Sequence, residues 1–298
     1  MDGILNVNKP PGRTSFSVVG LVRRLSGERR VGHAGTLDPA ASGVLPVCLG
    51  RATRVTEFLM ETPKTYRAQV ELGVATDTGD AEGQVVSRRD PSGVTRAAVL
   101  AALGSFLGEI QQVPPMFSAL KRAGRPLYEL ARAGITVERA ARPARIYRIE
   151  LLDWAPPLVT IEVVCGRGTY IRALAMDLGE KLGCGAHLHN LIRTRVGPFD
   201  LAGSVSLPEL EFALRAGYWL RYLDPPDTVL LDRSAIIAGA ATEEYIRHGR
   251  PLPAAPDGPF PAAGPEERCR AYTLDGCFLG VLRFNAANSH WQPEKVFL

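Results

Sequence analysis

The chain has 298 residues, 46% of them hydrophobic, and a formal net charge of +4 at pH 7, values that suit a globular protein with one large and one small domain. Its apolar stretches are interrupted by charge or proline before about 18 residues, and it begins without a charged-then-apolar leader, so we expect neither a membrane span nor export. Five cysteines without a CxxC pair favour reduced thiols, and we expect a cytoplasmic monomer.

The first predicted element is a short helix over residues 14–27. Thr14 or Ser15 can cap its start, and apolar residues recur at helical spacing from Phe16 to Leu25. The glycine that follows can end the helix, just before a glycine-rich segment begins.

Asp38 stands alone in that segment, VGHAGTLDPAASGVLPVCLGRATRV, residues 31–55. Apart from Glu28, no carboxylate lies within eighteen residues on either side, so a paired acid/base arrangement would need a partner from far away in sequence. Glycine-lined backbone lets a bulky ligand approach closely. The residue types alone also allow an Asx-turn or a cap before Pro39.

The central part of the chain mixes strand and helix patterns. Alternating apolar and polar residues from Tyr66 onward predict a half-buried strand, and an Asp/Thr/Gly-rich turn follows it. Because strands and helices do not alternate strictly, we expect an α+β fold rather than a parallel doubly wound sheet. The further predictions are a helix at 95–110, a protruding loop and helix at 111–134, strands at 144–155 and 158–168, and a helix at 169–183.

A break near RYLDPPDTVLLD, residues 221–232, separates the tail from the rest. Short strand-like runs between Pro and Gly clusters predict a small β-rich module over residues 226–298, after a main domain over residues 1–225. Within this module, residues 268–284 predict a hairpin with Asp275-Gly276 at its turn.

Basic residues are concentrated in three segments. Residues 1–65 carry nine Lys/Arg against five Asp/Glu, residues 113–148 eight against two, and residues 165–197 five against two, whereas residues 199–298 carry nine against thirteen. Three such segments on one body would attract a polyanion such as a nucleic acid. Since arginine outnumbers lysine thirty to five, a compositional bias and ordinary solvated faces explain part of this pattern.

Familiar metal and phosphate motifs are missing. Cys184, His187 and His189, with Cys165 upstream, have a spacing that matches no common zinc pattern, and the base-deaminase signature is missing. The segment around Asp38 lacks the Gly-Lys-Ser/Thr of a P-loop. We therefore expect no metal site and no cofactor.

Six blocks, in order and at suitable spacing, resemble the bacterial tRNA pseudouridine-55 synthase family. They are GILNVNKPPGRTSFSVV, the segment around Asp38, KTYRAQVELGVATDTGDAEG, VPPMFSALKRAGRPLYELARAG, CGRGTYIRALAMDLGEKLG and AHLHNLIRTRVGPF. The resemblance covers nearly all of residues 3–199, and the tail is more loosely similar to that family's PUA-type RNA-binding module. It implies a largely antiparallel mixed sheet in the catalytic domain, with residues 113–148 as an RNA-clamping insertion.

The resemblance also implies site residues. Asp38 matches the catalytic aspartate, and Arg172 matches the arginine that pairs with it. The substrate-binding matches are Tyr66, which would stack on the target base, Tyr170 and Leu191 in the pocket, and His33, which would enter the tRNA T-loop. Lys9 and Pro10 match a pair that supports the catalytic loop, and in the basic insertion we expect Lys121, Arg122 and Arg125 to contact the RNA backbone.

These residue types fit the implied reaction, which moves the uracil from an N1 to a C5 glycosidic bond without redox cofactor, metal or ATP. A lone carboxylate can act as nucleophile or base, and a nearby guanidinium would keep it ionised. Without the resemblance, Tyr66 and Tyr170 would be read as core residues, Arg172 as a helix-surface residue and His33 as a packed side chain.

The leading hypothesis is therefore an enzyme that makes pseudouridine at position 55 in the T-arm stem-loop of tRNA by base flipping, without a guide RNA. The alternative is a non-catalytic RNA-binding or tRNA-folding protein on the same fold. The combination of Asp38, Tyr66 and Arg172 argues against it, because binding alone does not need them. Guide-dependent relatives usually carry lysine-rich extensions, which this chain lacks.

Overall fold

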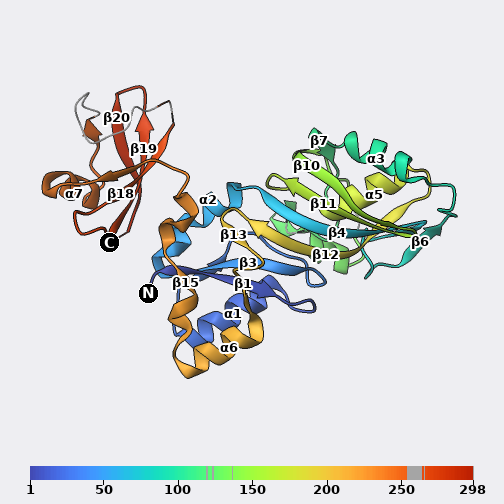
Figure 1. Cartoon of the computed structure of the whole chain (residues 1–298), viewed down its shortest axis with the longest axis horizontal. Helices are drawn as coiled ribbons and strands as arrows, with labels where there is room; N and C mark the ends of the chain where they lie inside the picture. The colour runs from blue at the N-terminus through green and yellow to red at the C-terminus, as the bar shows by residue number, and fades with distance from the viewer. Residues whose placement is uncertain (119, 123, 136, 254–263, 265, 298) are drawn as a thin grey trace.

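A computed structural model describes residues 1–118, 120–122, 124–135, 137–253, 264 and 266–297 of the chain. Two β-sheets organise it, a large one across the centre and a small one formed by the C-terminal residues (Figure 1). This is the mixed α+β architecture that the sequence predicts. Within the described residues, no helix is long and apolar enough to cross a membrane.

The large sheet has eleven strands, in the order β14-β1-β3-β12-β4-β11-β10-β7, with β2 beside β3, β13 beside β12 and β15 beside β1. Of its recorded pairings, β1–β14 and β3–β12 are parallel and the others are antiparallel, as expected. The strands are β1 (Gly3–Lys9), β2 (Val31–His33), β3 (Ser42–Leu49), β4 (Lys64–Leu72), β7 (Gly108–Gln112), β10 (Arg142–Ala155), β11 (Leu158–Cys165), β12 (Ala186–Val196), β13 (Phe199–Asp200), β14 (Val205–Ser206) and β15 (Leu223–Asp224).

The β3–β12 pairing joins the two halves of this sheet. It consists of two register pairs, Ile192 with Ser42 and Arg193 with Gly43. Gly43 has φ +105°, and a Cβ there would lie 2.2 Å from the Arg193 carbonyl oxygen, so only glycine allows the strands to approach this closely. We call this short pairing the β3–β12 join.

Helices cover the sheet in two groups. Helices α1 and α6 pack against each other beside β1, while α3 and α5 pack over the half that contains β10 and β12 (Figure 1). The helices are α1 (Ser15–Ser26), α2 (Thr56–Glu61), α3 (Arg96–Gly104), α4 (Leu127–Arg132), α5 (Ile171–Lys181), α6 (Leu207–Ala216) and α7 (Ala240–Arg247), with short 3₁₀ turns η1 (Gly50–Val55), η2 (Trp219–Tyr222) and η3 (Pro226–Leu230).

The first helix has the predicted caps but a partly different buried face. The Thr14 side chain accepts a hydrogen bond from the Ser17 amide, and Gly27 adopts the left-handed conformation with φ 72°. Val19 and Val22 of the predicted apolar stripe are buried, but Phe16 is 73% exposed and Val18 is buried beside them.

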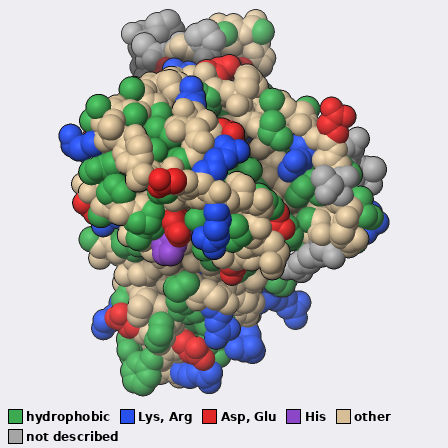
Figure 2. All heavy atoms as spheres, turned by 90° about the vertical axis from the view of Figure 1, so that its right-hand side faces the viewer, with side chains coloured by type: hydrophobic (Ala, Val, Ile, Leu, Met, Phe, Trp, Pro, Cys, Tyr) green, Lys and Arg blue, Asp and Glu red, His purple; other side chains and the backbone are tan. Residues whose placement is uncertain are grey.

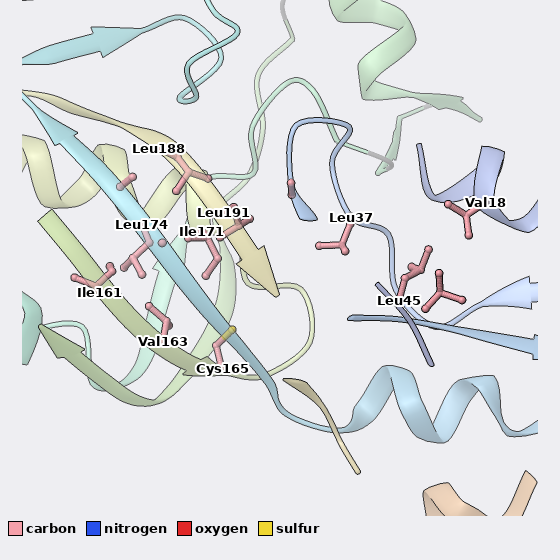
Figure 3. Close-up of a cluster of buried hydrophobic side chains, with 14 of the residues drawn as sticks. Val18, Leu37, Leu45, Ile161, Val163, Cys165, Ile171, Leu174, Leu188 and Leu191 are labelled. Carbon is pink, nitrogen blue, oxygen red and sulfur yellow. The ribbon is translucent and has the colours of Figure 1, made fainter. Parts of the chain in front are cut away.

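The main core joins both halves of the large sheet. Figure 3 shows Leu37, from the loop that carries Asp38, between Leu191 and Ile171 on one side and Val18 and Leu45 on the other. These side chains are buried and belong to one hydrophobic cluster. Burying an aliphatic side chain stabilises a fold by about 1.5–3 kcal/mol, so Leu37 fixes the loop to the core.

Two boundaries differ from the pattern-based ones. The predicted helix at 95–110 ends at Gly104, and β7 begins at Gly108, whose φ of +91° is available to glycine without strain. Residues 142–148 of the expected insertion belong to β10, which pairs with β7 and β11. The part outside the large sheet is therefore 113–141, which contains β8 (Lys121–Arg122), β9 (Arg125–Pro126) and α4.

The C-terminal residues form a five-stranded sheet in the order β16-β18-β19-β20-β17. The predicted hairpin is present, with Gly276 at φ 82° in its turn. Its contact with the main body includes Phe58, Phe278 and Phe297 in one apolar cluster, and Lys295 Nζ lies 2.6 Å from Glu57 Oε1. The strands are β16 (Ala235–Ile237), β17 (Leu252–Pro253), β18 (Arg268–Tyr272), β19 (Phe278–Asn285) and β20 (His290–Val296), and a separate hairpin pairs β5 (Val74–Thr76) with β6 (Val85–Arg88).

Candidate active site

A cavity of about 320 Å³ lies beside the loop that carries Asp38. Its other walls come from β4, from the start of α5 and from β12, elements that the sheet topology brings together. Five residues expected at a substrate site line it: Asp38, Tyr66, Tyr170, Arg172 and Leu191. Segments far apart in sequence thus converge on one hollow.

Asp38 and Arg172 form an ion pair, with 3.0 Å between Asp38 Oδ2 and Arg172 Nε. Arg172 is 5% exposed, whereas 43% of the Asp38 side chain is accessible, so the carboxylate faces the cavity from a buried cation. A second carboxylate, Asp80, lies 3.3 Å from Arg172 Nη1. Arg172 therefore forms ion pairs with both Asp38 and Asp80.

Two main-chain carbonyls complete the surroundings of Arg172. Its Nη2 donates to the Phe117 carbonyl at 2.6 Å and its Nη1 to the Thr78 carbonyl at 3.4 Å. These bonds fix the plane of the guanidinium, and with it the direction in which Arg172 Nε points toward Asp38. The Phe117 contact also ties the start of the basic insertion to the ion pair.

The environment of Asp38 contains opposing influences on its pKa. Loss of solvation is the largest and raises the pKa above its ordinary value, and the Asp80 carboxylate raises it further. The positive charges of Arg172 and Lys9 act in the other direction. The pKa of Asp38 is raised overall, which makes it a stronger base than a free aspartate.

Lys9 fixes the loop that carries Asp38 by three hydrogen bonds to main-chain carbonyls. It is fully buried, and its Nζ donates to the carbonyls of Pro10 at 3.0 Å, Arg13 at 2.7 Å and Pro39 at 3.2 Å. The Pro39 bond fixes the residue next to Asp38. Burial is the largest influence on the Lys9 ammonium and lowers its pKa to about 8.

Arg193 supports the same loop from the β3–β12 join, a contribution that the sequence did not reveal. It is 1% exposed and donates from Nε to the Val44 carbonyl at 2.8 Å and from Nη2 to the Gly35 carbonyl at 3.0 Å. Its backbone also pairs with Tyr66 in the β12–β4 ladder. A single buried residue thus connects the Asp38 loop with β4.

The other pocket residues are set by secondary structure. Tyr66 lies on β4 opposite Val163 of β11, and its pKa is raised mainly by burial. Tyr170 stands at the start of α5, where the Gln112 side chain donates to its carbonyl at 3.2 Å and accepts from its amide at 3.0 Å. Leu191, 9% exposed on β12, supplies an apolar wall.

His33 does not line this cavity. It ends β2, paired with Val47, and leads into the Asp38 loop. Its Nδ1 is buried and has no hydrogen-bond partner among the described residues, and burial lowers the pKa of the imidazole. A neutral ring therefore prevails at pH 7.

The basic insertion is described in part. Arg125 is exposed, while Leu127 and Leu130 of α4 are buried. For Lys121 and Arg122 the structure gives the backbone of β8, and their side chains fall outside the described part. Figure 2 shows Lys and Arg side chains over much of one face, with Asp and Glu between them.

Asp80 was missed by the sequence analysis, which treated TDTGDAEG only as a turn. Its Oδ1 accepts a hydrogen bond from the Thr78 hydroxyl at 2.6 Å, and its backbone pairs with Leu188 in an isolated bridge. The local signal was an Asp/Thr/Gly-rich loop, which most often marks only a turn. Only the bridge to β12 brings it to Arg172.

A partly accessible carboxylate, held by a buried arginine beside a cavity with two tyrosines, is an arrangement suited to nucleophilic or base chemistry. Comparisons with known proteins identify the class. Residues 23–171 match the TruB family pseudouridylate synthase N-terminal domain, and residues 172–230 match the tRNA pseudouridylate synthase B C-terminal domain.

Full-length relatives agree with these matches. The chain is 45% identical to tRNA pseudouridine synthase B of Dehalococcoides mccartyi, covering 100% of this chain and 97% of that protein. It is 46% identical to the protein of the same name from Burkholderia mallei, covering 99% and 97%.

A solved structure has the same fold. The chain in a crystal structure of a Cbf5-Nop10-Gar1 complex is 28% identical, with a TM-score of 0.75, covering 99% of this chain and 85% of that one. The protein therefore belongs to the TruB family of pseudouridylate synthases, and it is an isomerase of the tRNA-modification type.

Proposed function

We propose that the protein converts uridine 55 in the T-arm loop of tRNA to pseudouridine, as a stand-alone cytoplasmic monomer without a guide RNA. The observation that carries this proposal is the Asp38–Arg172 pair, 3.0 Å apart, in a cavity that Tyr66 and Tyr170 also line. The names of the full-length relatives support tRNA as the substrate.

The chemistry is an intramolecular transfer. The bond between C1′ and N1 of the uracil breaks, the base turns, and a bond between C1′ and C5 forms, while the C5 proton is lost and N1 gains one. Asp38 acts as nucleophile or base, and Arg172 keeps it ionised and directed into the cavity. Tyr66 stacks on the base, and Tyr170 and Leu191 limit its position in the pocket.

Access requires base flipping, because a stacked uridine cannot reach a carboxylate inside a cavity. Extrusion costs about a few kcal/mol, which phosphate contacts and stacking offset. Lys121, Arg122 and Arg125 of the insertion contact the RNA backbone, residues 226–298 act as a PUA-like RNA-binding module, and His33 fills the space that the base leaves.

A non-catalytic RNA-binding protein is the second candidate on this fold. It would retain the basic insertion but would not need a guanidinium buried between Asp38 and Asp80, since buried ion pairs contribute little net stability.

A guide-dependent enzyme is a further alternative. A solved structure of an H/ACA RNP bound to a substrate RNA contains a chain 26% identical to this one. The identity to tRNA pseudouridine synthase B is higher, 45%, and this favours stand-alone action.

The test is incubation of the purified protein with an unmodified tRNA transcript, followed by carbodiimide and alkali mapping of pseudouridine. We expect one modified site, at position 55, without added metal, nucleotide or guide RNA. Binding of the transcript without any modification would favour the second candidate. Modification only in the presence of a guide RNA would contradict stand-alone action.

A further inference from the structure

Two histidines and a glutamate come together outside the cavity, on strands β4 and β12. His187 pairs directly across from Glu71 in the sheet. The register shifts between Leu188 and Asn190, so His189 has no partner on β4, which is how a β-bulge re-aims a side chain. One ligand-type atom of each of Glu71, His187 and His189 lies within 4.8 Å of the others.

The hydrogen bonding of His187 makes this cluster unusual. His187 is 5% exposed, and its Nδ1 lies 3.0 Å from the Val74 carbonyl oxygen, which can only accept. Nδ1 must therefore carry a hydrogen, and in the neutral ring the lone pair of Nε2 faces Glu71 Oε2 at 3.6 Å. In that neutral form two acceptors face each other, and either a proton on Nε2 or a metal cation between the two atoms would remove the conflict.

The distance between His187 Nε2 and Glu71 Oε2 is long for a hydrogen bond and suits two ligands of one metal ion. Glu71 Oε2 is 3.6 Å from His187 Nε2 and 3.2 Å from His189 Nδ1. Two of the three ligand–ligand separations thus approach the edges, about 3.3–3.4 Å, of a tetrahedron with metal–ligand bonds of about 2.0–2.1 Å, and all three atoms lie within 4.8 Å of one another. A histidine ligand usually donates its other ring N–H to a carbonyl, as His187 does to Val74.

The geometry points to a binding site for a zinc-type divalent cation formed by Glu71, His187 and His189. Two imidazoles and one carboxylate are a donor set that zinc favours, and three protein ligands leave one coordination position open. No metal was expected from the sequence because the spacing of Cys184, His187 and His189 matches no common zinc pattern, and Glu71 lies far from them in sequence, on another strand. Cys184 does not belong to the group, since its side chain is buried in the main core.

The site is accessible and adjoins the reacting groups. The side chains of His189 and Glu71 are 44% and 28% exposed, which gives an ion a path from solvent. His189 also lines a small pocket together with Asp38, Asp80 and Arg172. The proposal assigns no step of the isomerisation to the metal and does not depend on the proposed function.

The experiment is a zinc titration of the chelator-treated full-length protein in competition with a chromophoric chelator. We expect one Zn²⁺ per chain and a melting temperature that rises with zinc concentration. Outer partners of a metal ligand alone are worth about 10- to 100-fold in affinity, so Glu71→Gln and His189→Ala should each weaken binding at least about tenfold. Both positions are partly exposed, so these variants test binding without emptying the core.

Matched controls use donors elsewhere in the chain. His248 is exposed at the end of α7, outside the large sheet, and Cys277 is an exposed thiol, so His248→Ala and Cys277→Ser should bind zinc as the wild type does. Wild-type affinity in Glu71→Gln and His189→Ala would overturn the proposal and indicate an ordinary imidazolium–carboxylate contact. Loss of zinc only in Cys277→Ser would assign binding to that thiol and overturn it equally.

Discussion

Asp38 and Asp80 share one guanidinium: Arg172 meets the first at Nε, 3.0 Å away, and the second at Nη1, 3.3 Å away. The two carboxylates therefore influence each other through a common partner as well as directly. The Asp38 side chain is 43% exposed and the Asp80 side chain 16%, so we expect Asp38 to react and Asp80 to orient the arginine that they share.

Asp38→Asn should abolish pseudouridine formation while RNA affinity stays within about tenfold, or roughly 1.4 kcal/mol. The amide keeps the shape of the side chain but cannot act as nucleophile or base. Single-turnover assays and filter binding on the same tRNA measure the two effects. A variant with near-wild-type turnover would remove Asp38 from the mechanism.

The pH dependence of the rate should shift in opposite directions in two variants. The Asp80 carboxylate raises the pKa of Asp38, so Asp80→Asn moves the acid limb of the pH–rate profile to lower pH. Arg172 lowers that pKa, so Arg172→Met moves the acid limb to higher pH. Because both lose orientation of the carboxylate, maximal rates should fall by about a hundredfold.

The control for this pair is Glu82→Gln, an exposed acid in the same loop as Asp80 that does not contact Arg172 in the described structure. Its profile should match the wild type. If both Asp80→Asn and Arg172→Met shift the acid limb in the same direction, the limb does not report Asp38.

Lys9 should contribute stability that grows with pH. Its pKa is about 8 in the folded state against 10.5 for the free side chain, so between these values the unfolded chain binds more protons. The free energy of unfolding of the wild type, relative to Lys9→Met, should therefore rise from pH 8 to 10.5 by up to about 3 kcal/mol. Urea unfolding at several pH values measures it, and a constant difference would contradict a depressed pKa.

RNA affinity should fall steeply with salt, and replacing Lys121, Arg122 and Arg125 together with alanine should flatten the dependence. Each lost phosphate contact lowers the magnitude of the slope of log K against log salt by about 0.7–0.9. Replacing the exposed Arg215 of α6, which lies outside both the insertion and the C-terminal module, serves as the control. An unchanged slope in the triple variant would place the RNA on another surface.

His33 should act in base flipping rather than in proton transfer, because it does not line the cavity that Asp38 faces. His33→Ala should slow reaction more on an intact T-arm hairpin than on a short unstructured RNA with the same uridine. His33→Phe, which retains an aromatic face, should restore part of the rate. Equal losses on both RNAs without rescue would indicate a structural or acid/base role.

The sequence pattern predicted correctly those features that depend only on residues close together in the chain. The caps of α1, the alternation in β4 and the turn at Gly276 each depend on neighbouring residues, and the structure shows all three. Phe16 was misplaced because the many apolar residues of α1 allow more than one buried stripe, and packing buried Val18 beside Val19 and Val22.

The site required long-range contacts that no local pattern contains. Asp38 could be singled out by its isolation among glycines, and the family resemblance suggested its partner. Asp80 reaches Arg172 only through its bridge to Leu188, and Arg193 reaches the Asp38 loop only because β12 runs beside β3. Burial and pairing of distant strands, rather than residue type, decide both contacts.

The β3–β12 join has a consequence for how activity reports folding. Asp38 belongs to one half of the large sheet, while Tyr66, Tyr170 and Arg172 belong to the other. The two register pairs, the buried Arg193 guanidinium and the shared core around Leu37 hold the halves together, and opening at the join would separate Asp38 from Arg172. Catalytic activity therefore depends on the β3–β12 join staying closed. We expect activity to disappear on heating before the circular dichroism signal changes.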